Sequence, residues 1–162
     1  MPIATKSSKL DISKIENTKK FADIVSSNID KGDVILFYGE VGVGKTTFIK
    51  YLINHLQKKY KKDITEVTSP TFSLLNQYQL NEVEIHHYDL YRLNSKNDIL
   101  CLNIFEDISG KIILIEWPEL LNELKPKKTI DIKFEYGENF KSRYLTISAN
   151  EKLKIFDEFK SI

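Results

Sequence analysis

Cysteine is nearly absent from this 162-residue sequence, in which Cys101 stands alone. A single cysteine cannot form an intramolecular disulfide, and it argues against a cysteine-based zinc site. These absences favour a reduced, cytoplasmic setting. The sequence also lacks any run that approaches about 18 apolar residues, so no membrane span is expected. The basic N-terminus has no apolar stretch after it, so we do not expect a signal peptide.

Net charge is also nearly absent, because 24 basic residues stand against 23 acidic ones. The net of +1 excludes a strongly basic protein that coats nucleic acid, and it excludes an acidic solvating tail. A local lysine run at 58–62 remains as a candidate contact for a nucleic acid or a partner. We interpret it as a solvated helix end, because cations stabilise helix C-termini. The length and the lack of repeats or linkers predict one domain, 1–162.

Hydrophobic periodicity and turn residues predict the elements along the chain. Helices are expected at 14–29, opened by a capping box of Ser13 and Glu16, at 45–59 and at 98–108, with a short helix or turn from Pro118. Strands are expected at 34–38, 74–80, 83–88, 112–116, 129–136 and 144–149. Residues 1–12 should be loosely ordered, and 150–162 should form a C-terminal helix capped by Asn150. Helices and strands alternate first and the strands then run on antiparallel, which predicts an α/β three-layer P-loop NTPase-like fold with a mixed parallel/antiparallel sheet.

A phosphate-binding loop is the strongest motif. Residues 39–46 read Gly-Glu-Val-Gly-Val-Gly-Lys-Thr and match GxxxxGK[ST] between an apolar strand and a helix. Glycines allow successive backbone N–H groups to surround phosphates at the positive end of the helix. Lys45 is expected to reach the β- and γ-phosphates of a nucleotide, and the Thr46 hydroxyl to ligate Mg²⁺.

Two acidic residues are candidates for the acid that binds Mg²⁺ together with Thr46, or for the base that orients the attacking water. Glu116 follows four apolar residues, the pattern of a strand that delivers an acid to the metal beside the loop. It could ligate Mg²⁺ or orient the attacking water. Asp89 ends another apolar strand and could take either role.

Missing motifs narrow the enzyme class. No Asn-Lys-x-Asp box for guanine is present, and Arg92 and Arg143 are the only arginines. Too few arginines for a phosphoryl-clamping lid weaken the interpretation as a small-molecule P-loop kinase without excluding it. A non-hydrolysing nucleotide-gated adaptor also stays open, although Lys45, Thr46 and Glu116 are all intact.

Four motifs in fixed order then identify a family resemblance. Gly32-Asp33-Val34 leads into the glycine loop that ends at Thr47, and 69–72 read Ser-Pro-Thr-Phe. Residues 87–93 read His-Tyr-Asp-Leu-Tyr-Arg-Leu, and 115–119 read Ile-Glu-Trp-Pro-Glu. Across 13–149 the chain resembles the TsaE (YjeE) family of small bacterial P-loop ATPases. Val43 departs from the usual alanine of that loop and should leave its backbone cradle intact.

The resemblance implies a cytoplasmic Mg²⁺-dependent ATPase needed for threonylcarbamoyladenosine in tRNA, beside the anticodon. It would act with TsaD and TsaB and meet tRNA, if at all, through that complex. Its turnover alone should be slow unless a partner or Arg92 supplies an arginine finger.

The resemblance also implies site roles. Thr71 would sense the γ-phosphate, Trp117 would lie beside the nucleotide, Arg143 would approach it, and Thr18 would sit near the base or ribose. The nucleotide-binding loop would comprise Gly39, Glu40, Val41, Gly42, Val43, Gly44, Lys45, Thr46 and Thr47, with Lys45, Asp89 and Glu116 as catalytic residues. Cys101 is expected in an apolar core helix. Of the adjacent His86 and His87, which face opposite ways on a strand, one should be core or support the site.

Overall fold

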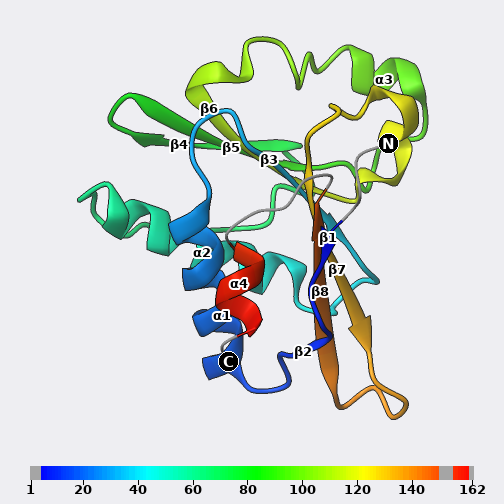
Figure 1. The fold of residues 1–162 in the computed structure, drawn as a ribbon. Helices are drawn as coiled ribbons and strands as arrows, with labels where there is room; N and C mark the ends of the chain where they lie inside the picture. Colours follow the sequence, from blue (N-terminus) through cyan, green and yellow to red (C-terminus); the bar gives the residue numbers. More distant parts are fainter. Residues whose placement is uncertain (1–4, 150–154, 161–162) are drawn as a thin grey trace.

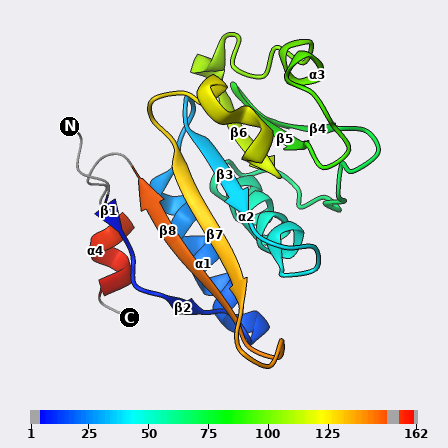
Figure 2. The same ribbon diagram turned by 90° about the vertical axis from the view of Figure 1, so that its right-hand side faces the viewer.

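In the computed structural model of the chain, residues 5–149 and 155–160 are described. They form one mixed sheet of eight strands, in the order β1-β8-β7-β3-β6-β5-β4 with β2 also paired to β8 (Figures 1 and 2). Strand β3 is parallel to β6 and β7, and β5 is parallel to β6, whereas the other pairs are antiparallel. The strands are β1 Thr5–Lys6, β2 Leu10–Asp11, β3 Val34–Tyr38, β4 Leu75–Leu80, β5 Val83–Asp89, β6 Lys111–Glu116, β7 Ile130–Tyr136 and β8 Arg143–Ala149. The predicted α/β fold with a mixed sheet is confirmed.

Helical segments cover both faces of this sheet and give it three layers (Figure 1). One face carries the helices α1 (Ile15–Asn28), α2 (Lys45–Lys59) and α4 (Ile155–Lys160). The other carries α3 (Lys96–Leu100) and the 3-10 segments η1 (Ile108–Gly110) and η2 (Pro118–Leu124). The central strands β3 and β6 are therefore apolar on both faces, as buried parallel strands require. No helix in the described part of the chain is long and apolar enough to cross a membrane.

Helix α2 is held to the sheet by the apolar face that its spacing predicted. Phe48, Ile49, Leu52, Ile53 and Leu56 have no exposed surface. The Phe48 ring contacts Phe37 of β3 and Phe134 of β7, with ring centroids 6.2 and 5.7 Å away. Because Phe37 and Phe48 lie on either side of the glycine loop, this packing fixes both ends of the loop against one core.

The N-terminal region differs from the prediction. Residues 5–12 are not loose: β1 and β2 pair with β8. The predicted capping box is also wrong, because α1 begins after Lys14 without a side-chain cap. The Ser13 hydroxyl instead accepts the Arg143 N–H (3.0 Å), and the Ser13 N–H donates to Asp11 (2.8 Å). Hydrogen bonding from the Ser13 side chain, and then from its backbone, lowers the pKa of the Asp11 carboxyl. Residues 1–4, the predicted cap Asn150, and 151–154 and 161–162 of the predicted last helix lie outside the described residues, and 155–160 form α4.

The predicted helix at 98–108 is also wrong. Ser95 accepts the Asp98 N–H (3.2 Å), so α3 begins early and ends at Leu100. Asn103 and Asp107 have φ of 49° and 50°, which a continuing right-handed helix cannot contain. Ile99 is buried from α3 and Ile104 from the turns that follow it, so the two do not lie along one helical stripe. Cys101 is consequently exposed and is not a core residue.

We predict that Gly39→Ala destabilises the protein. Gly39 has a φ of 146°, and an added Cβ would lie 2.9 Å from both Phe134 Cβ and Val43 Cγ1. The free energy of unfolding in urea should fall by about 1–3 kcal/mol. Gly110→Ala is the control, because an added Cβ there meets nothing within 4 Å. Equal stability of the two variants would contradict a tightly packed loop entrance.

Candidate functional site

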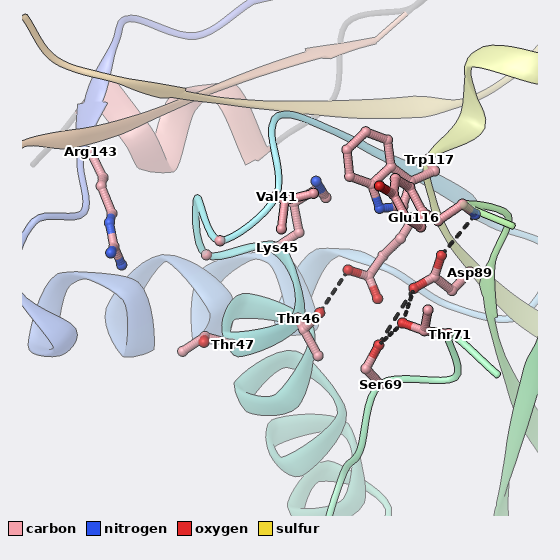
Figure 3. Close-up of a pocket in the computed structure, with 13 residues that line it drawn as sticks. Val41, Lys45, Thr46, Thr47, Ser69, Thr71, Asp89, Glu116, Trp117 and Arg143 are labelled. Atoms are coloured by element: carbon pink, nitrogen blue, oxygen red, sulfur yellow. Dashed lines mark hydrogen bonds between the residues drawn. The ribbon is translucent and has the colours of Figure 1, made fainter. Parts of the chain in front are cut away.

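A cleft of about 330 Å³ opens at the carboxyl ends of β5 and β6, beside the loop that joins β3 to α2 (Figure 3). Open α/β sheets bind ligands at this edge. Most of the predicted site residues meet here from five separate stretches of the chain. The lining residues are Val41, Gly42, Gly44, Lys45, Thr46, Thr47, Ser69, Thr71, Asp89, Tyr91, Glu116, Trp117 and Arg143.

The glycine loop turns sharply and leads directly into α2. Gly44 is the N-cap of α2 with a φ of 115°, a value that L side chains rarely adopt. Val43 is 1% exposed and belongs to the core, so its bulk lies outside the cleft. The loop therefore leaves the start of α2 open to an anion, which favours anion binding at a helix N-terminus.

Not every predicted loop residue lines the cleft. Gly39 and Glu40 instead line a neighbouring open hollow of about 740 Å³, which shares Val41, Tyr91 and Trp117 with the cleft. Their predicted nucleotide contacts stay predictions. Their carbonyl oxygens are connected to the cleft, because both accept hydrogen bonds from Lys45, which lines it.

Lys45 is turned back onto its own loop. Its Nζ donates to the carbonyl oxygens of Gly39 and Glu40, the latter at 3.0 Å, and lies 3.8 Å from the centre of the Trp117 ring. The residue is buried, and burial lowers the pKa of its ammonium, whereas the carboxylates of Glu116, Glu119, Asp89 and Glu40 oppose that shift. A phosphate group would stabilise the charged form in the same way.

Glu116 is buried at the end of β6 and joined to the first turn of α2. The Thr46 hydroxyl donates to Glu116 Oε1 at 2.8 Å (Figure 3). The other oxygen, Oε2, lies 2.8 Å from Nε2 of His87 on β5. Both carboxylate oxygens are thus bonded, and the group has one defined orientation.

Asp89 lies directly beside Glu116, because the two are paired in the register of β5 and β6. Its Oδ2 accepts the Thr71 hydroxyl at 2.9 Å and the Ser69 hydroxyl at 3.4 Å (Figure 3). Its Oδ1 accepts the N–H of Tyr91 at 2.9 Å. The segment around Thr71 is therefore tied to Asp89, whereas the glycine loop is tied to Glu116.

The remaining predicted residues are placed as follows. Trp117 and Arg143 both line the cleft, with Arg143 at the end away from Asp89 in Figure 3. Thr18 is buried on α1 and is not among the lining residues, so its role near the base or ribose stays a prediction. Arg92 donates to the Phe72 carbonyl (2.6 Å) and lies over the Phe72 ring, outside the cleft lining.

The donor set fits magnesium. The Thr46 hydroxyl and the Glu116 carboxylate are hard oxygen ligands 2.8 Å apart at the cleft wall. Within the described residues no group of three or more His, Cys, Asp or Glu is arranged to hold a metal. Mg²⁺ suits such a site, because it commonly takes one or two protein ligands and completes its shell with water and substrate phosphates.

Three residues at this site were missed by the sequence reasoning. Ser69 and Tyr91 lie inside motifs that were recognised, but only Thr71 and Asp89 were singled out there. His87 was left without a partner, although it is two residues before Asp89 and so lies on the same face of β5. That period-2 relation was the available signal.

Comparisons with known proteins agree on one family. A family model described as "Threonylcarbamoyl adenosine biosynthesis protein TsaE" matches residues 12–145. The tRNA threonylcarbamoyladenosine biosynthesis protein TsaE of Rickettsia conorii is 37% identical over 137 residues, which are 85% of this chain and 75% of that protein. The protein of the same name from Bacillus subtilis is 32% identical over 118 residues, 72% of this chain and 70% of that protein.

A solved structure supports the fold. The crystal structure of Bacillus subtilis YdiB aligns with a TM-score of 0.70 at 22% sequence identity. The alignment covers 98% of this chain and 94% of that chain. At this identity the likeness bears on the architecture alone.

We predict that Mg-ATP changes the fluorescence of Trp117. The ring contacts Tyr91 at a tilt of 48° (centroids 4.8 Å apart) and lies against the Lys45 ammonium, which a bound phosphate would draw away. Trp117 is the only tryptophan, so the change in intensity or wavelength has one source. An unchanged spectrum at saturating Mg-ATP would contradict a nucleotide site in this cleft.

Proposed function

The chain belongs to the TsaE family of threonylcarbamoyl adenosine biosynthesis proteins, and we propose that it serves this pathway as a Mg²⁺-dependent ATPase. The observation that carries the proposal is the Thr46–Glu116 hydrogen bond beside the glycine loop. It joins the hydroxyl expected to ligate the metal to the acid expected to share it. That pairing supports phosphoryl chemistry over simple nucleotide storage.

In this proposal each part of the cleft has a task. Backbone N–H groups of 42–46 and the start of α2 hold the phosphates, and Lys45 moves from its loop carbonyls to the β- and γ-phosphates. Thr46 and Glu116 would hold Mg²⁺, which when bound neutralises charge on the phosphate oxygens. Trp117 and Tyr91 contact each other and would supply an aromatic wall of the cleft.

Thr71 is proposed to sense the γ-phosphate. Its hydroxyl and that of Ser69 are bonded to Asp89, so a ligand that draws either hydroxyl away changes the segment around 69–72. Asp89 also competes with Glu116 as the group that orients water, since both carboxylates lie at the same edge of the sheet. The two variants described below separate these roles.

We place the activity in a complex with TsaD and TsaB, with tRNA reached through that complex. Two residues that line the cleft, Val41 (68%) and Tyr91 (56%), expose large apolar surface, as does Phe72 (82%), which follows Thr71 in the chain. Exposed apolar groups of this size favour a protein interface. Arg92 is engaged by Phe72, so an arginine finger would come from a partner, and turnover by the lone chain should be slow.

We predict that Lys45→Ala lowers Mg-ATP turnover by about 10²–10³-fold, because it removes the charge nearest the transferring phosphate. Turnover is measured for the full chain alone and with purified TsaD and TsaB. Lys50→Ala is the matched control, an exposed lysine on the same helix, and should keep wild-type turnover.

The same assay decides between the alternatives. Phosphate transfer to an added small molecule would indicate a kinase. ATP binding without turnover, even with TsaD and TsaB, would indicate a nucleotide-gated adaptor. Wild-type turnover in Lys45→Ala would contradict the ATPase proposal.

We predict that Glu116→Gln reduces turnover more than ATP affinity. Glutamine keeps the volume and one hydrogen bond but loses the charge, and such losses commonly cost about 10²–10⁴-fold in rate. Asp89→Asn is the matched variant for the competing acid. Both are measured at one fixed Mg²⁺ concentration. Normal turnover in Glu116→Gln together with a dead Asp89→Asn would show that the two roles are reversed.

A further inference from the structure

His87 is a fully buried histidine one pleat below the cleft. It lies on β5 two residues before Asp89, and it pairs in register with Leu114, two residues before Glu116. These four residues therefore face the same side of the sheet, toward α2. From this position the imidazole reaches diagonally across the parallel pair to Glu116.

The imidazole makes a single polar contact. Nε2 lies 2.8 Å from Glu116 Oε2, while Nδ1 is one of two buried side-chain polar atoms without a partner in the described structure, the other being Asn54 Oδ1. A carboxylate only accepts, so Nε2 carries the proton. An unpaired buried nitrogen costs stability, and an apolar residue would fill the space without that cost. Packing alone does not account for a histidine here.

The geometry points to a role through Glu116. With Oε2 held by His87, Oε1 is the oxygen left for Thr46 at the cleft wall. We propose that His87 is a positioning residue that fixes the Glu116 carboxylate for the metal. The inference rests on the metal role proposed for Glu116. In it, a hydrogen bond from the neighbouring strand holds the metal-binding carboxylate in place.

The neighbouring His86 also bonds a carboxylate, but away from the cleft. Its Nε2 lies 2.9 Å from Glu84, a partly exposed residue on the same strand, and its side chain faces the opposite side of the sheet. Two adjacent histidines thus bond carboxylates, but only His87 bonds one that lines the cleft. His86 is therefore the matched control.

The experiment compares three variants of the full chain. His87→Leu removes the donor, His87→Gln keeps an amide N–H at a similar reach, and His86→Gln alters the control site. We measure kcat, KM for ATP, and the Mg²⁺ concentration that gives half-maximal nucleotide binding. His87→Leu should lower kcat or raise that Mg²⁺ concentration by about 10–100-fold, with KM changed less. His87→Gln should recover most of the loss, and His86→Gln should match wild type.

A double variant tests the route of the effect. If His87 acts through Glu116, His87→Leu adds no further loss in a Glu116→Gln background. Additive losses would overturn the proposal, as would a normal His87→Leu, or equal damage by Leu and Gln with lowered melting temperatures. If the wild-type chain binds Mg-ATP without hydrolysing it, the ATPase proposal fails, and the Mg²⁺ dependence of binding still decides the role of His87.

Discussion

The hydrogen bond from Thr46 to Glu116 links two parts of the site that lie 70 residues apart in the sequence. It forms only because β3 and β6 are parallel neighbours, with Phe37 opposite Glu116. Parallel pairing brings the start of α2 and the end of β6 to the same edge of the sheet. The next pairing, of β6 with β5, adds Asp89 and His87 to that edge. The whole cleft depends on this order of three parallel strands and on the two-sided burial that stabilises it.

Much of this arrangement could be predicted from local sequence. The strands over 34–38 and 112–116 and the helix over 45–59 have strong apolar patterns, and the structure confirms them. The two-residue strands at Thr5–Lys6 and Leu10–Asp11 could not be predicted, because they exist only through pairing with β8. Ser13 has the sequence of a helix cap but bonds the Arg143 backbone, a contact set by tertiary structure.

The candidate site was predictable as a set of residue types rather than as a set of contacts. The glycine loop, Thr71, Asp89, Glu116 and Trp117 stand in motifs, and the fold brings them to one cleft. The partners of each acid depend on strand register, which no single motif specifies. Hence the sequence could place His87 on the same face of its strand as Asp89, but it could not show that Glu116 is its partner. The exposure of Cys101 follows from a helix that ends earlier than its apolar residues suggested.

The folded-back position of Lys45 also bears on which anions the cleft accepts. Its ammonium is buried, and two carbonyl oxygens and an aromatic face hold it. A ligand must replace all three contacts before it gains from the charge, so binding is an exchange rather than a simple attraction. A lone phosphate ion offers little beyond what it displaces. In the proposed function a triphosphate would also engage the loop N–H groups and the helix start, so this resting arrangement would favour longer phosphate chains.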